Sequence, residues 1–373
     1  MNSNMLPIFG LKNLENTCFL NSSLQCILSC SNLLHNLESY RHHLPYNSLM
    51  KNLLDLGIQK TKSPRPILDH LIHKNSVYGD YLQQDSHEAF STLLDILEDE
   101  IKFLKRPFRL DFQGYVIYNI HCLKCSKSEY LFQECSTLMI DLESNPEKSY
   151  KATQIAEFKI NQPRNGPHNT FIKCKNRNIL NHPNVKMSGF DIKRDKLFEN
   201  LYGIKHLLNL RSSKTNPKTD LEQLIQNHFD FQFYSQAKHG YKCDDCKHQS
   251  TESFKKYYLF KSPKVLVICL KKFSISKRFS RKRWVKSSIS VSYPEKLDLS
   301  PFMMTTESKG FKTQGNYTLL GVVSHSGGLR GGHYTSFFRK NKRWYHASDN
   351  YVKNSSLRSA LSGDPYLLFY ERD

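Results

Sequence analysis

A cysteine near the start of the chain is the residue best suited to nucleophilic chemistry. Cys18 follows a turn-like segment, residues 10–17, and apolar residues recur at helical spacing after it. Asn16 or Thr17 is a natural N-cap, which places Cys18 in the first turn of a helix. Because the partial positive charge of a helix start lowers the pKa of a thiol, Cys18 is a candidate nucleophile. A buried structural cysteine is equally compatible with this position taken alone.

A nucleophilic thiol needs a base that is distant in sequence and close in space, and His333 is the best candidate. His333 follows two glycines at the head of an expected strand, where the backbone can approach a substrate closely. A hairpin turn expected at residues 339–342 brings Ser348 and Asp349 back towards His333. Either side chain can orient the imidazole, and the sequence leaves the choice between them open.

An acyl-transfer site also needs hydrogen-bond donors for the oxyanion. Asn13 lies in the turn before Cys18, so its side-chain amide can act together with the backbone N–H groups at the helix start. The alternative is that Asn13 only caps or turns the chain.

Four of the ten cysteines form two Cys-x-x-Cys pairs, which have the spacing of zinc knuckles. The four expected ligands are Cys122, Cys125, Cys243 and Cys246. The two pairs lie much farther apart than in a compact zinc ribbon, so the spacing alone does not establish a common site. Four thiolates leave no open coordination position, and the expected Zn²⁺ site is therefore structural rather than catalytic.

The composition is that of a folded protein. The chain has 373 residues, of which 39% are hydrophobic, enough for a sizeable core in one large domain or two ordinary ones. No apolar run approaches the ~20 residues that cross a bilayer, so no membrane partner is expected. The N-terminus lacks a secretory signal, which leaves the cytoplasm, the nucleus or both as the expected location. We also expect no separate domain before the segment around Cys18, because little chain precedes it.

The chain carries a formal net charge of +20, from 54 basic and 34 acidic residues. This excess favours acidic partners such as nucleic acid or chromatin, although a general lysine-rich composition explains it without a partner. The densest basic run, residues 277–286, is interpreted as a solvated hairpin. A nuclear localisation signal or a histone- or RNA-facing patch is the alternative for this run.

The apolar pattern predicts helices in the N-terminal part of the chain and mainly strands afterwards. A long helix is expected from about residue 84 to 103, and a shorter one at 221–229. Residues 142–219 are rich in Lys, Asn, Pro and Ser, and we interpret them as an irregular or partly disordered insertion. Strands are expected at residues 257–260, 265–270, 317–324, 333–339, 343–347 and 366–371.

Five segments, in the same order along the chain, resemble the ubiquitin-specific proteases. Residues 10–25, which contain Asn13 and Cys18, resemble the cysteine box of that family. Residues 317–336, which end in Gly-Gly-His-Tyr-Thr-Ser, resemble its histidine box. The other three are the Gln-Gln-Asp-Ser-His-Glu segment at 83–88, the strand segment at 265–273 and the closing strand at 366–372.

The resemblance implies an α+β fold, that of a papain-like cysteine protease with a helical thumb, a β-rich palm and zinc-bearing β fingers. It implies one catalytic domain over residues 1–373. Within this domain the expected parts are a thumb at about 10–110, fingers at 111–141 and 220–262, a palm at 263–373 and an insertion at 142–219. The zinc prediction is strengthened, because many members carry a four-cysteine zinc site at the fingertips.

By matching positions, the resemblance implies Cys18 as nucleophile, His333 as general base and Asn13 as oxyanion donor. It also implies that Asp85 and Glu88 hold the basic C-terminal tail of ubiquitin. The implied reaction is hydrolysis of the isopeptide or peptide bond after the C-terminal glycine of ubiquitin, through a thioester. The implied partners are ubiquitin and ubiquitinated proteins.

Two positions depart from the pattern of the family. Glu15 stands where most members have glycine, and its charge near the sulfur can raise the pKa of Cys18. Ser348 occupies the third catalytic position, which is usually Asp or Asn, and Asp349 follows it, as in a minority subgroup. We expect either Ser348 or Asp349 to orient His333, and the other to support it.

These departures keep alternative functions open. A catalytically impaired, ubiquitin-binding scaffold is favoured by Glu15 and Ser348. A zinc-containing nucleic-acid-binding protein explains the charge and the cysteine pairs but leaves Cys18 and His333 without a role. An enzyme that cleaves a ubiquitin-like modifier would use the same residues as one that cleaves ubiquitin.

Overall fold

The computed structural model describes most of the chain outside one long internal segment. The described residues are 7–104, 107–122, 124–125, 128–142, 219–230, 232–234, 242–247, 253–278, 281–303, 315–328 and 331–373. The insertion expected at 142–219 falls almost entirely outside these residues. Within the described part, the elements are helical up to residue 102 and mainly strands after it, as the apolar pattern predicts.

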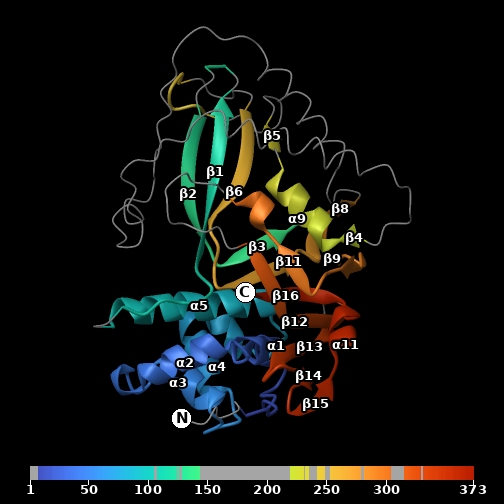
Figure 1. Cartoon of the computed structure of the whole chain (residues 1–373). Coiled ribbons are helices and arrows are strands. Elements are labelled where there is room, and N and C mark those ends of the chain that lie inside the picture. The colour runs from blue at the N-terminus through green and yellow to red at the C-terminus, as the bar shows by residue number, and fades with distance from the viewer. Residues whose placement is uncertain are drawn as a thin grey trace.

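Helices near the N-terminus form one end of the molecule, coloured blue to teal in Figure 1. Helix α1 spans Cys18–Ile27 and is buried along its whole length. Helix α5, Ser86–Lys102, begins and ends within two residues of the helix expected there. The remaining elements are α2 (Ser31–Ser39), α3 (Leu49–Gly57) and α4 (Arg65–Lys74), with the 3₁₀ turns η1 (Arg41–His43) and η2 (Ser76–Gly79).

A large sheet packs against these helices. Its strands are β3 (Thr137–Ile140), β7 (Val265–Leu270), β11 (Lys296–Asp298), β12 (Asn316–Gly328), β13 (Gly331–Lys340), β14 (Arg343–Ser348), β15 (Tyr351–Ser355) and β16 (Pro365–Arg372). In space the order is β15-β14-β13-β12-β16-β7-β3, and β11 pairs with β12. Only β3 and β7 run parallel within this sheet, as far as the described residues show.

Strand β7 shows why residues 265–270 are apolar without alternation. The strand is buried on both faces of the sheet, which is the environment that produces a continuous apolar run. Its odd-numbered residues belong to the core shared with the N-terminal helices, and its even-numbered residues belong to a second core on the opposite face. The predicted strand at 265–270 is confirmed with the same bounds.

A second sheet extends away from the helices, at the top of Figure 1. It consists of β1 (Gly114–Cys122), β2 (Ser128–Cys135), β5 (Gln232–Tyr234) and β6 (Ser253–Lys261), in the order β2-β1-β6-β5. Neighbouring strands are antiparallel. This sheet corresponds to the β fingers that the resemblance implies.

One expected boundary is wrong. The range 111–141 assigns β3 to the fingers, but β3 pairs with β7 at the edge of the large sheet. The reason is its apolar residues Leu138 and Ile140, which are buried in the second core with helix α9. Helix α9 spans Leu221–Phe229, has the bounds predicted from the sequence, and buries one face in that core.

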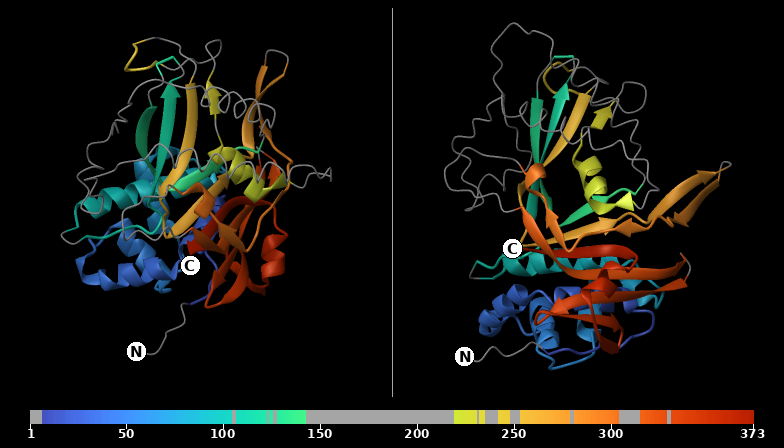
Figure 2. Two further views of the ribbon diagram at one scale, coloured as in Figure 1. Left: turned by 45° about the horizontal axis from the view of Figure 1, so that its top comes forward. Right: turned by 45° about the vertical axis from the view of Figure 1, so that its right-hand side comes forward.

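The basic run at 277–286 lies in a hairpin, as interpreted from the sequence. It is formed by β8 (Phe273–Arg278) and β9 (Arg281–Lys286), and the right-hand view of Figure 2 shows it extending from the body of the protein. The remaining short elements are β4 (Thr219–Asp220), which pairs in parallel with β10 (Val291–Ser292), η3 (Ser300–Phe302) and α11 (Leu357–Leu361). Among the described helices, none combines the length and the apolarity needed to cross a membrane.

The close approach of α1 to the large sheet depends on Gly321 of β12. A Cβ atom at this position would lie 2.7 Å from the Sγ atom of Cys26, closer than packed atoms allow. The glycine therefore lets α1 settle directly on β12 and β13. This packing brings the N-terminal end of α1, with Cys18, to the head of β13, where His333 lies.

Candidate active site

A tight turn delivers Cys18 to the start of α1. Cys18 is the first helical residue, as predicted, but Thr17 does not cap the helix with its side chain. The Thr17 hydroxyl instead accepts a hydrogen bond from the Leu14 N–H at 2.8 Å. The Oδ1 atom of Asn13 accepts the N–H of Thr17 at 3.1 Å. Asn13 therefore shapes the turn, and its side-chain NH₂ group remains available for other acceptors.

The sulfur of Cys18 lies in a buried environment, and the residue is 1% exposed. Burial raises the pKa of the Cys18 thiol above its ordinary value, and the Asp349 carboxylate raises it further. The backbone N–H of Tyr334 lowers the pKa by donating a hydrogen bond to the sulfur. Since Tyr334 directly follows His333, this contact places the nucleophile beside the candidate base.

The imidazole of His333 is held by Ser348. The distance between His333 Nε2 and Ser348 Oγ is 2.8 Å. The two residues meet because β13 and β14 form a hairpin whose two-residue turn, Asn341 and Lys342, has positive φ at both positions. The turn lies inside the predicted range 339–342, so this part of the sequence-based prediction is confirmed.

Asp349 forms hydrogen bonds with other residues than the imidazole that Ser348 contacts. Its two carboxylate oxygens accept hydrogen bonds from the side-chain amides of Asn13 and Asn21, each at 2.8 Å. Its backbone carbonyl accepts the N–H of Leu11 at 2.9 Å. The residue has a φ of +50°, so the backbone turns sharply after Ser348. The serine therefore contacts the imidazole, and the aspartate fixes the amide of the candidate oxyanion donor.

Asp85 and Glu88 lie at the start of α5 in unlike environments. Asp85 is the N-cap, and its Oδ1 atom accepts the N–H groups of His87 and Glu88 at 2.7 and 3.1 Å. Its Oδ2 atom accepts the hydroxyl of Tyr366. Both oxygens of Asp85 are therefore engaged within the protein, whereas the side chain of Glu88 is exposed. The expected contact of these two residues with a basic peptide stays a prediction.

Three contacts at the site were not anticipated from the sequence. Asn21, inside α1, donates to Asp349, and Tyr334 donates through its backbone N–H to Cys18. Gln83 hydrogen bonds to both the N–H and the C=O of Gly332. Asn21, Gln83 and Tyr334 all lie in segments that resemble family motifs. Their positions were therefore visible in the sequence, but their partners were not.

The four cysteines of the two Cys-x-x-Cys pairs converge at the far end of the fingers. The Sγ atoms of Cys122, Cys125, Cys243 and Cys246 all lie within 4.8 Å of one another. Cys122 ends β1, and Cys243 and Cys246 come from the segment between β5 and β6, so the finger strands bring the pairs together.

The geometry of this cluster fits a tetrahedral metal. Zn–S bonds of about 2.3 Å in a tetrahedron separate sulfurs by roughly 3.8 Å. The distance between the sulfurs of Cys125 and Cys243 is 3.6 Å. The backbone N–H groups of Asp245 and Cys246 also donate to the sulfur of Cys243. Burial raises the pKa of the Cys243 thiol, and these donors oppose that rise by stabilising the thiolate, which is the form that binds metal.

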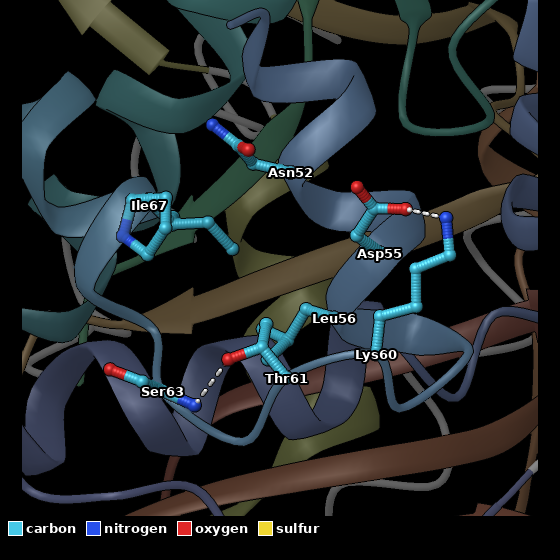
Figure 3. Close-up of a pocket in the computed structure, with 8 residues that line it drawn as sticks. Asn52, Asp55, Leu56, Lys60, Thr61, Ser63 and Ile67 are labelled. Atoms are coloured by element: carbon cyan, nitrogen blue, oxygen red, sulfur yellow. Dashed lines mark hydrogen bonds and ion pairs between the residues drawn. The ribbon is translucent and has the colours of Figure 1, made fainter. Parts of the chain in front are cut away.

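A pocket of about 260 Å³ lies between α3 and α4, and its residues are drawn in Figure 3. Its polar groups are paired with one another: Asp55 contacts Lys60 at 3.1 Å, and the N–H of Ser63 donates to the hydroxyl of Thr61 at 3.1 Å. Neither Cys18 nor His333 lines this pocket. It is therefore separate from the candidate active site.

Comparison with family models matches residues 9–370 to the family described as "Ubiquitin carboxyl-terminal hydrolase". Among characterised proteins, human ubiquitin carboxyl-terminal hydrolase 27 is 26% identical over 400 residues, which cover 97% of this chain and 78% of that protein. Human ubiquitin carboxyl-terminal hydrolase 22 is 25% identical over 399 residues, covering 97% of this chain and 65% of the relative.

Solved structures confirm the fold. The "SAGA Ubp8/Sgf11/Sus1/Sgf73 DUB module bound to ubiquitin aldehyde" contains a chain that matches with a TM-score of 0.66 and 18% identity. The match covers 98% of this chain and 70% of that chain. The same module with a substituted Ubp8, bound to monoubiquitin, gives a TM-score of 0.65 at 17% identity.

Glu15 adopts a backbone conformation that favours glycine. Its φ is +64°, in the left-handed region, and its side chain is exposed to solvent. The carboxylate that raises the pKa of Cys18 is that of Asp349, although the sequence suggested Glu15 for this effect. A left-handed conformation costs a residue with a Cβ roughly 1–2 kcal/mol. Glu15 therefore acts on the turn through its backbone.

We predict that Glu15→Gly stabilises the protein. Glycine removes the cost of the left-handed conformation in the folded state. This gain exceeds the extra conformational entropy that glycine gives the unfolded chain, so we expect the free energy of unfolding to rise by about 0.5–1 kcal/mol. The measurement is the urea midpoint at constant m-value. Glu15→Ala is the matched control, because it removes the carboxylate but keeps a Cβ in the left-handed region. A gain from Glu15→Ala equal to that from Glu15→Gly would show that charge, rather than φ, is the cause.

Proposed function

We propose that this chain, which belongs to the ubiquitin carboxyl-terminal hydrolase family and is a cysteine-type deubiquitinating enzyme, uses Cys18 as its nucleophile and His333 as its base. One observation carries the assignment of these residues. Cys18, at the start of α1, lies at the head of β13, where His333 is bonded to Ser348 and the backbone N–H of the next residue, Tyr334, lowers the pKa of the Cys18 thiol.

The proposed reaction begins when His333 takes the proton of the Cys18 thiol. The thiolate attacks the carbonyl carbon of the C-terminal glycine of ubiquitin, and the oxyanion receives hydrogen bonds from Asn13 and from N–H groups at the start of α1. The C–N bond breaks as the imidazolium of His333 gives its proton to the leaving amine. His333 then takes a proton from water as the oxygen attacks the thioester carbonyl, and the C–S bond breaks as the imidazolium returns that proton to the Cys18 sulfur. Ubiquitin leaves with a free carboxylate.

Ser348 and Asp349 have separate roles in this proposal. Ser348 holds the imidazole through its hydroxyl, at 2.8 Å from Nε2, and leaves Nδ1 for the proton of the thiol. Asp349 holds the amide of Asn13, and the same carboxylate holds Asn21. The negative charge thus supports the oxyanion donor instead of the imidazole.

The basic tail of ubiquitin is assigned to the exposed carboxylate of Glu88. Asp85 supports this contact indirectly, because its oxygens cap α5 and bind Tyr366 and so fix the position of Glu88. The chain carries a large excess of basic residues, so an exposed carboxylate at the start of α5 is a specific place for a basic peptide to bind.

A second candidate function is a ubiquitin-binding scaffold with impaired catalysis. The observation that favours it is the burial of Cys18, which with Asp349 raises the pKa of the thiol. A thiol that stays protonated is a poor nucleophile. The scaffold and the enzyme bind ubiquitin alike, and they differ in whether Cys18 reacts.

We predict that ubiquitin carrying a C-terminal vinyl sulfone labels the wild-type protein but not Cys18→Ala. Turnover of a fluorogenic ubiquitin substrate falls by at least about 1000-fold in the same variant. Cys135→Ala is the matched control, because Cys135 lies outside both the active site and the four-cysteine cluster. Ubiquitin binding without labelling would support the scaffold, and preferential labelling by a probe built on a ubiquitin-like modifier would correct the substrate.

We predict that Ser348→Ala and Asp349→Asn both lower kcat but differ in the pH dependence of Cys18 alkylation. Ser348→Ala frees the imidazole and lowers kcat by about 100-fold, without removing the charge near the sulfur. Asp349→Asn cannot accept both amides and lowers kcat by a similar factor through Asn13. Because the Asp349 charge raises the pKa of Cys18, its removal also lowers that pKa. The rate of Cys18 alkylation by iodoacetamide, measured against pH, should shift to lower pH in Asp349→Asn only. A shift to lower pH in Ser348→Ala alone would reverse the assignment.

We propose that the four-cysteine cluster holds one structural Zn²⁺. The metal would join the segment that follows β1 to the segment that precedes β6, which are distant in sequence. Bound there, it supplies a cross-link that stabilises the fingers. No step of the reaction requires it.

We predict that the purified protein contains one zinc per chain and that Cys246→Ser loses it. The loss exposes the finger strands and lowers the melting temperature, because the free energy of zinc binding is part of the free energy of folding. Metal content is measured by mass spectrometry and stability by thermal denaturation. Cys135→Ser is the control and should retain its zinc. Full zinc content in Cys246→Ser, or a metal-free wild type with the same melting temperature, would contradict the assignment.

A further inference from the structure

Among the described residues, the first residues of β13 have a neighbouring strand on one side only. β14 pairs with β13 from Ser336 onwards, at the Ser336–Ala347 pair, so within the described part of the chain the stretch that contains His333 is paired only with β12. Unpaired strand edges leave N–H and C=O groups without partners. Pairing with β14 therefore does not fix the backbone of His333, although the side chain of His333 is bonded to Ser348 of that strand.

The side chain of Gln83 fills the place of the missing strand. Its Oε1 atom accepts the N–H of Gly332 at 2.7 Å, and its Nε2 atom donates to the C=O of the same residue. A glutamine amide has the same donor and acceptor as a peptide group, so this pair of bonds reproduces a strand-to-strand pairing. It attaches the residue directly before His333 to the segment that leads into α5.

Atoms of β12 also lie close to Gly332. A Cβ atom on this residue would lie 2.2 Å from Nε2 of His325 and 2.4 Å from the carbonyl oxygen of Ser326. Only glycine fits at this position, and its backbone N–H and C=O also bond to the amide of Gln83. Few positions are open to it, and the backbone of the next residue, His333, is correspondingly fixed.

The same segment that carries Gln83 also contacts the turn before Cys18. The side-chain amide of Asn16 donates to the C=O of Tyr81 at 2.9 Å, and both residues have positive φ. Residues 81–83 thus bond to the turn of the nucleophile at one end and to the strand of the base at the other. The relative position of Cys18 and His333 is set partly by this short segment.

We propose that Gln83 is a positioning residue for His333, acting through the backbone of Gly332. This role rests on the proposed function of His333 as the base, and Gln83 itself does not contact the sulfur or the imidazole in this proposal. Loss of its amide frees the head of β13 to move away from Cys18. Because a displacement of about 1 Å can cost 100-fold in rate, the effect falls on the chemical step rather than on ubiquitin binding.

The test compares Gln83→Ala and Gln83→Glu with the neighbouring variant Gln84→Ala. Glu at position 83 keeps the acceptor for the Gly332 N–H but presents an oxygen to the Gly332 C=O. The amide of Gln84 bonds instead to the C=O of Val77, within the same loop. We expect both Gln83 variants to lower kcat by about 10- to 100-fold, with KM within about twofold of wild type. For Gln84→Ala we expect both kcat and KM to stay within about twofold of wild type.

A second readout is independent of ubiquitin. The rate at which iodoacetamide alkylates Cys18 is measured against pH, because pairing with a well-placed imidazole allows thiolate to form at lower pH. We expect the profile of both Gln83 variants to shift to higher pH, and that of Gln84→Ala to match wild type. Circular dichroism and the melting temperature establish that the compared samples are folded.

An unchanged alkylation profile in a folded Gln83→Ala would overturn the proposal, as would a loss confined to KM, which would indicate a contact with ubiquitin. Equal losses in Gln83→Ala and Gln84→Ala would also overturn it, since they would indicate disruption of the whole loop. If the wild type does not turn over ubiquitin, the proposed function fails, and the alkylation profiles still decide the role of Gln83.

Discussion

The contact between the start of α1 and the head of β13 is the interaction on which the site depends. The two elements pack against each other, and the backbone N–H of Tyr334 lies where it lowers the pKa of the Cys18 thiol. The fold is arranged to make this meeting possible, because α1 is buried throughout and Gly321 allows it to lie directly on the sheet. An element that positions only Cys18 or only His333 matters less for the site than this packing of α1 on the sheet.

Burial of α1 fixes the geometry at an electrostatic cost. A buried thiolate is destabilised, so the pKa of Cys18 is raised, and the N–H of Tyr334 offsets only part of this effect. The thiolate must therefore be stabilised by a cation formed at the moment it is needed. A neighbouring imidazole that accepts the thiol proton supplies that cation, which is why the position of His333 relative to Cys18 matters more than the helix start alone.

The sequence was sufficient where a single local pattern determines the structure. The apolar run of β7, the helix α9 and the two-residue turn before β14 follow from periodicity and turn chemistry. It was insufficient where the outcome depends on contacts between distant segments. β3 was assigned to the fingers because four residues carry no signal of which sheet they join. Gln83 and Gly332, which hydrogen bond to each other, lie far apart in the sequence. The sequence motif therefore indicated Gln83 but not its bonding partner.

The roles of Ser348 and Asp349 were also not predictable from the sequence, because they depend on the φ angle of Asp349. Adjacent side chains of a continuing strand point to opposite faces, but the positive φ of Asp349 ends the strand and redirects its carboxylate towards Asn13 and Asn21. A charge next to the imidazole would stabilise the imidazolium directly. Here a neutral hydroxyl contacts the imidazole, and the charge orients the amide of Asn13 instead. The same charge raises the pKa of Cys18, so the arrangement favours a firmly held oxyanion donor over an easily formed thiolate.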